Sequence, residues 1–195
     1  MFRITLLAFA ALLRLNAASP EVTVIIQLGE VFSPQAWQAM EAETGRIAKQ
    51  AGIRLQFVEH SKAAGKEFDD LVVFRMKGRC AMNAFPAPFD ERGPYASAAV
   101  AGGNVLPFGE VRCDRIRESL KTAMAGRDFA QGDELLGRAL GRVVAHELYH
   151  MLANTRGHSK SGVAKEALSA RQLLSDDLSL ADHDCAVLSA RRDFR

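Results

Sequence analysis

The sequence contains no apolar run long enough to cross a membrane. Residues 4–13 form its longest apolar stretch, interrupted only by Thr5, whereas a transmembrane helix needs about 20 apolar residues. Internal repeats and low-complexity segments are also absent, which excludes a fibrous protein. We therefore expect no stable membrane anchor and an ordinary folded domain.

The composition that remains is that of a globular protein. Of the 195 residues, 48% are hydrophobic and 25% are charged, which is typical of soluble domains. The length is sufficient for one domain with a core of its own and is short for two.

The N-terminus has the pattern of a signal peptide. Arg3 precedes the apolar stretch of residues 4–13, and the small residues Ala17, Ala18 and Ser19 follow it. This order predicts a signal peptide at residues 1–18, export to the periplasm or the extracellular space, and a single mature domain at 19–195.

Net charge gives no indication of a polyanionic partner. The whole chain carries +2, and the predicted signal peptide contains Arg3 and Arg14 but no acid, so the mature chain has a net charge of zero. A neutral domain lacks the electrostatic signature of nucleic-acid binding or of binding to an anionic membrane. We therefore expect neither as a partner.

The cysteines are few, and their number is odd. Cys80, Cys113 and Cys185 are the three. An oxidising compartment permits one disulfide, and we predict that Cys80 pairs with Cys113 because both lie at the ends of expected core strands. The alternative of three buried, reduced thiols remains open. No cysteine lies close to the histidine motif described below, which argues against a cysteine-rich structural zinc site.

Hydrophobic periodicity predicts alternating strands and helices. Core strands are expected at residues 22–28, 53–57, 71–76 and 105–113, with a short edge strand at 96–101. Ser33 and Pro34 are expected to begin one helix, and Asp114 and Asp133 to cap two more, the last running to about Asn154. Two shorter helices are expected within 163–192. This order predicts an α/β sandwich: a mixed twisted sheet with an antiparallel edge strand, backed by helices, with a small helical C-terminal part.

The third of these helices carries the chemistry. His146, Glu147 and His150 form the pattern H-E-x-x-H. At 100° per residue the two histidines lie 40° apart, one turn from each other, so their imidazoles can converge on one metal ion. Glu147 lies at the edge of the same arc and is placed to accept a proton from water at the metal. The flanking residues are apolar on more than one face, which indicates a buried helix whose polar side chains need a partner such as Zn²⁺.

A catalytic zinc needs a third protein ligand, and we predict His158. Asn154 tolerates the left-handed conformation that ends a helix, and Gly157 permits a tight turn. Together they would bring His158 back to the histidine pair, with the three side-chain nitrogens within about 4 Å of one another. Glu166 is the alternative third ligand.

Two acidic groups further along the chain are weaker candidates. Asp176 and Asp177 could orient a ligand histidine from behind. Asp182, His183 and Asp184 resemble a metal site, but acids at the start of a helix are more often helix caps.

The segment from His146 to His158 resembles the zinc-binding segment of the metzincin clan of metallopeptidases, which includes the astacins and matrixins. The expected order of elements before it also resembles the clan's upper subdomain. More closely still, the chain resembles exported bacterial proteins that carry an H-E-L-x-H helix and a later His-Ser pair. The resemblance covers about residues 21–165. It implies a zinc peptidase in which His146, His150 and His158 bind the metal and Glu147 is the general base.

The sequence departs from the clan pattern at two points. The clan continues H-x-x-G-x-x-H, which would place glycine at Ala153 and the last ligand at Arg156, whereas His158 lies two residues later. No methionine follows Met151, so the clan's methionine turn is missing, and Ala164 occupies the corresponding stretch.

These observations favour a secreted zinc endopeptidase that hydrolyses a peptide or protein substrate. An extended substrate would add to the edge strand at residues 96–101 by main-chain hydrogen bonds. A non-catalytic exported domain that binds zinc for a structural or interaction role is the alternative. Metal-dependent hydrolysis of a non-peptide amide also fits the motif.

Overall fold

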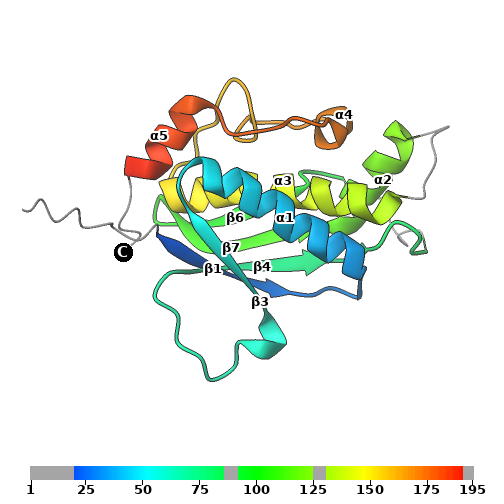
Figure 1. The fold of residues 1–195 in the computed structure, drawn as a ribbon, viewed down its shortest axis with the longest axis horizontal. Coiled ribbons are helices and arrows are strands. Elements are labelled where there is room, and N and C mark those ends of the chain that lie inside the picture. The colour runs from blue at the N-terminus through cyan, green and yellow to red at the C-terminus, as the bar shows by residue number, and fades with distance from the viewer. Residues whose placement is uncertain (1–19, 86–91, 125–130, 191–195) are drawn as a thin grey trace, which may run out of the picture.

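A five-stranded mixed sheet forms the centre of the fold in the computed structural model, which describes residues 20–85, 92–124 and 131–190 (Figure 1). The strand order is β3-β1-β4-β7-β6. The first four strands are parallel to their neighbours, and β6 pairs antiparallel with β7 at the edge. The predicted signal peptide at 1–18 lies outside the described residues.

The elements follow one another in the predicted order. The strands are β1 (Glu21–Gln27), β2 (Val31–Phe32), β3 (Arg54–Glu59), β4 (Leu71–Lys77), β5 (Arg79–Cys80), β6 (Ala96–Ala101) and β7 (Asn104–Arg112). The helices are α1 (Pro34–Gln50), α2 (Cys113–Ala123), α3 (Gly132–Ala153), α4 (Ala170–Leu174) and α5 (Asp182–Ala190), and a short 3-10 turn spans His60–Lys62. The predicted α/β sandwich is confirmed. The small second sheet of β2 and β5 was not predicted, because two-residue strands leave no periodic pattern.

Helices α1 and α3 lie side by side over one face of the sheet, and α4 and α5 lie beyond α3 (Figure 1). Alternate side chains of β1, namely Val22, Val24 and Ile26, are completely buried in the core. The two helices approach closely because α3 has glycine where they cross. A Cβ on Gly137 would lie 2.3 Å from the carbonyl oxygen of Ala36.

A buried arginine fixes α3 one turn before the histidine motif. Arg142 is fully buried, and its Nε donates to Oε1 of Glu43 on α1 at 2.7 Å. Its Nη1 donates to the carbonyl oxygens of Gln172, Leu173 and Ser175 at the end of α4. A single side chain therefore joins three helices behind the site.

The predicted helix starts are partly right. Ser33 caps α1, its hydroxyl accepting from the Ala36 N–H, and Pro34 is the first residue. Asp114 and Asp133 do not cap their helices, which begin after Arg112 and Gln131. Both carboxylates lie in the first turn and bind elsewhere, Asp114 to Arg117 at 2.8 Å and Asp133 to the Met82 N–H at 2.6 Å.

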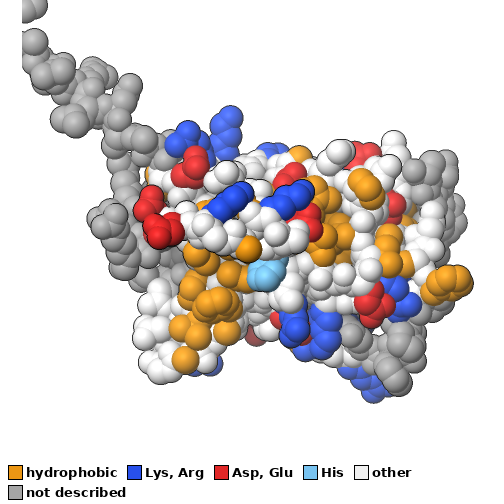
Figure 2. Space-filling view, turned by 90° about the horizontal axis from the view of Figure 1, so that it is seen from below, with side chains coloured by type: hydrophobic (Ala, Val, Ile, Leu, Met, Phe, Trp, Pro, Cys, Tyr) orange, Lys and Arg blue, Asp and Glu red, His pale blue; other side chains and the backbone are white. Residues whose placement is uncertain are grey.

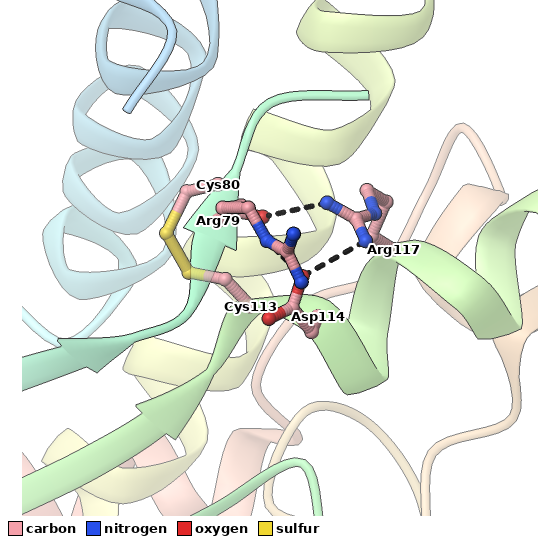
Figure 3. The surroundings of a disulfide bond; sticks show 5 residues. All are labelled: Arg79, Cys80, Cys113, Asp114 and Arg117. Carbon is pink, nitrogen blue, oxygen red and sulfur yellow. Dashed lines mark hydrogen bonds and ion pairs between the residues drawn. A yellow bond between two sulfur atoms is a disulfide. The ribbon is translucent and has the colours of Figure 1, made fainter. Parts of the chain in front are cut away.

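The predicted disulfide between Cys80 and Cys113 is present, with Cα atoms 4.9 Å apart. It joins β5 to the first residue of α2 (Figure 3). Beside it, Asp114 accepts from both Arg79 and the fully buried Arg117. Bond and ion pairs together fix both ends of the segment that leads into the edge strand. Cys185 has a free thiol.

Hydrophobic side chains reach the surface in groups separated by charged ones, as the view from below shows (Figure 2). Among the described residues, the most exposed large ones are Leu28, Val31, Phe85, Val100 and Phe108. None of the described helices combines the length and hydrophobicity that a membrane span requires.

Candidate metal centre

His146 and His150 point in the same direction from α3. Their Nε2 atoms lie 3.1 Å apart, and their rings meet edge to face with 4.7 Å between centroids. This is the arrangement that the four-residue spacing predicts.

Backbone carbonyl groups fix the orientation of both rings. The Nδ1 of His146 lies 2.8 Å from the carbonyl oxygen of Val163, and the Nδ1 of His150 lies 2.8 Å from that of Thr155. A carbonyl only accepts, so each Nδ1 carries the proton and each Nε2 presents its lone pair to the space between the rings. The hypothesis that Asp176 or Asp177 orients a ligand histidine is wrong. Asp176 is fully exposed and pairs with Arg138.

The chain reverses directly after α3. Asn154 caps the helix in the left-handed conformation, with φ 42°. Its side chain accepts from the Val105 N–H at 2.8 Å and donates to Asn104 at 3.1 Å, which anchors the turn to the sheet. The predicted helix end is confirmed. The left-handed residue is Asn154 alone, because Gly157 does not adopt a positive φ.

The reversal brings His158 to the histidine pair. One nitrogen from each of the three rings lies within 4.8 Å of the other two, a wider spacing than the predicted 4 Å. The ring centroids of His158 and His150 are 4.7 Å apart. His158 is exposed, so the cluster is open on that side. Glu166 lines the neighbouring cleft but does not join the cluster.

The donor set fits a transition metal. Burial lowers the pKa of His146 to about 4 and also lowers the pKa of His150. These imidazoles are therefore neutral at physiological pH, and neutral imidazole is the form that binds metal. Three imidazole nitrogens without a carboxylate or thiolate suit zinc and its neighbours rather than magnesium or calcium.

Glu147 lies beside the cluster, 5% exposed. Burial raises the pKa of its carboxyl from 4.5 to about 7, although the backbone N–H of Ala98 on β6 donates to it. Sequence analysis did not identify the Ala98 contact. A backbone donor leaves no trace in residue type, and only the pairing of β6 with β7 places it there.

A cleft runs along β6 past these residues. It consists of two adjoining hollows of about 300 and 310 Å³, and His146 and Glu147 line both. The first hollow extends past Tyr95 and Arg115 towards Leu168, and the second past Val100 towards Arg156. The candidate metal centre is thus at the middle of an open groove beside the edge strand.

The fold is that of a metzincin-like zincin. The structure resembles the crystal structure of archaemetzincin from Methanopyrus kandleri with a TM-score of 0.52, covering 90% of this chain and 97% of the other, at 10% sequence identity. At this identity the likeness is one of fold. No family model matches the sequence. No curated protein matches it either.

Proposed function

We propose that this chain is a zinc-dependent peptidase in which His146, His150 and His158 bind Zn²⁺ and Glu147 is the general base. The observation that carries the proposal is the convergence of three imidazoles beside a buried carboxyl group at the middle of a groove. The zincin-like fold is consistent with it.

The metal, when bound, would supply a Lewis acid that polarises the scissile carbonyl and acidifies water. Glu147 would take the proton from the attacking water and deliver it to the leaving amine. A carboxyl pKa of about 7 matches both roles, because a base that must also act as an acid works best near the operating pH. The Ala98 N–H orients this carboxyl towards the cleft.

The proposed substrate is an extended peptide or protein segment. Strand β6 has a partner on one side only, so its other edge can receive a further strand by main-chain hydrogen bonds. The hollows on either side of Glu147 would then accommodate side chains on the two sides of the scissile bond.

Export remains part of the proposal. The disulfide Cys80–Cys113 supports an oxidising compartment, in agreement with the signal peptide predicted at residues 1–18. Nucleic acid and a stable membrane anchor are not proposed as partners.

Cleavage of a broad peptide library by the zinc-loaded protein tests the function. We expect cleavage that a chelator abolishes, zinc restores, and Glu147→Gln removes while zinc stays bound. Glu134→Gln, on an exposed residue of the same helix, is the matched control. Unchanged cleavage in Glu147→Gln would remove Glu147 from the mechanism.

A non-catalytic zinc-binding domain is the second candidate. The absence of any methionine after Met151 favours it. One bound zinc per chain, with no cleavage of any library peptide under several conditions, would decide for this candidate. Cleavage of a non-peptide amide alone would change the substrate class and leave the roles of the four residues as proposed.

A further inference from the structure

The loop that carries His158 is attached to the C-terminal helix by a buried carboxylate. Ser159, the residue after His158, donates its hydroxyl to Oδ1 of Asp184 on α5. The Ser159 N–H also donates to the Ala164 carbonyl oxygen at 2.9 Å. The backbone and the side chain of Ser159 therefore fix the end of a loop whose ligand is itself exposed.

Asp184 is an unusual residue for the interior. It is 0% exposed, and it makes no ion pair with a lysine or arginine in the described part of the chain. Its second oxygen, Oδ2, is buried and accepts no hydrogen bond from the described residues. Burying a carboxylate is costly unless donors compensate it. Here the Ser159 hydroxyl and the first turn of α5 provide that compensation.

Tyr149 links the same group to the second histidine. Its hydroxyl interacts with the side chains of Ser159 and Asp184, and its ring meets that of His150 edge to face at 5.6 Å. The sequence predicted Tyr149 to be a packing residue and Asp184 to be a helix cap. The structure instead brings both together behind the metal ligands.

We propose that Asp184 is a positioning residue for the metal centre. It acts through Ser159 to hold the 155–159 loop so that His158 faces His146 and His150. Helix α5, which contributes no ligand, thereby completes the site. This inference rests on the proposed function, since it assigns a role in zinc binding.

Zinc affinity, measured by competition with a chromophoric chelator, is the first test. Loss of a group that orients a metal ligand typically weakens binding about 10- to 100-fold. We expect this loss in Ser159→Ala and in Asp184→Asn. Asp182→Asn, on an exposed carboxylate of the same helix, should bind zinc as the wild type does. The double variant should be no weaker than the weaker single variant, because both changes break one hydrogen bond.

Hydrogen exchange of the metal-free protein is the second test. Backbone amides at 155–159 should exchange faster in Ser159→Ala than in the wild type, while those of α3 stay unchanged. Ser159→Thr keeps the hydroxyl and should restore both affinity and protection. If Asp184→Asn does not fold, the comparison of Ser159→Ala with Ser159→Thr decides.

The outcomes separate the two proposals. Wild-type protein that binds no zinc would contradict the proposed function, and loop exchange alone would then judge the anchor. Wild-type protein that binds zinc, with a folded Ser159→Ala of equal affinity and equal exchange, would overturn the role of Asp184 and leave the proposed function intact.

Discussion

His146 and His158 stack nearly face to face, with 5.4 Å between ring centroids and 25° between ring planes, although one belongs to α3 and the other to the loop after it. Two imidazoles in this arrangement can present nitrogens to a common point. The contact depends on the left-handed turn at Asn154, since a continued helix would rise about 12 Å between His150 and His158.

Replacing His158 tests whether this contact serves zinc binding. We expect His158→Ala to weaken zinc binding by more than the about 100-fold loss that accompanies removal of a group behind a ligand. The unfolding midpoint of the metal-free protein should stay unchanged, because the side chain is exposed. Chelator competition and urea unfolding measure the two effects. Unaltered zinc affinity would exclude His158 as a ligand, and Glu166→Ala would then be the variant to examine.

The pKa of Glu147 predicts a pH-dependent stability. The unfolded chain loses this proton near pH 4.5, whereas the folded protein keeps it to about pH 7. The folded state thus binds more protons in this window, and stability falls as the pH rises through it. At about 1.4 kcal/mol per unit, Glu147→Gln should stabilise the metal-free protein by roughly 1–3 kcal/mol at pH 8 and hardly at all at pH 4. Urea unfolding at both pH values measures this. A gain of equal size at both would point to a packing effect.

Removing the disulfide should destabilise the whole domain. Cys80 and Cys113 close a loop of 33 residues, and a loop of this size predicts a loss of about 2–4 kcal/mol in the free energy of unfolding of the double serine variant. Cys185→Ser, at the free cysteine, should change it by less than about 1 kcal/mol. Denaturant unfolding with and without a reductant provides the measurement. A wild-type midpoint that a reductant leaves unmoved would contradict this prediction.

Two helical glycines should respond to alanine in opposite ways. A Cβ at Gly137 would lie 2.3 Å from the Ala36 carbonyl oxygen, whereas nothing lies within 4 Å of one at Gly45. Gly137→Ala should therefore destabilise the protein by about 1–3 kcal/mol through overpacking. Gly45→Ala should stabilise it by up to about 1 kcal/mol through helix propensity. Thermal unfolding of both variants compares them directly, and a stabilising Gly137→Ala would show that α1 and α3 separate at little cost.

Local patterns were sufficient for much of the fold. Apolar alternation located β1, β4 and the edge strand β6, and Ser33-Pro34 located the start of α1, because these signals depend on neighbours within a few residues. The caps expected at Asp114 and Asp133 were wrong for the same reason. Arg117 and the Met82 N–H take those carboxylates, and neither contact is visible in a local pattern.

For the site, the sequence by itself determined the pair His146 and His150 with Glu147 between them, because helix geometry alone places residues four apart on one face. Only the tertiary structure decided the rest. The turn at Asn154 brings His158 back, β6 supplies the Ala98 N–H to Glu147, and α5 buries Asp184 against Ser159. Each of these depends on segments distant along the chain, and their approach is set by core packing and strand pairing rather than by any residue's own preference.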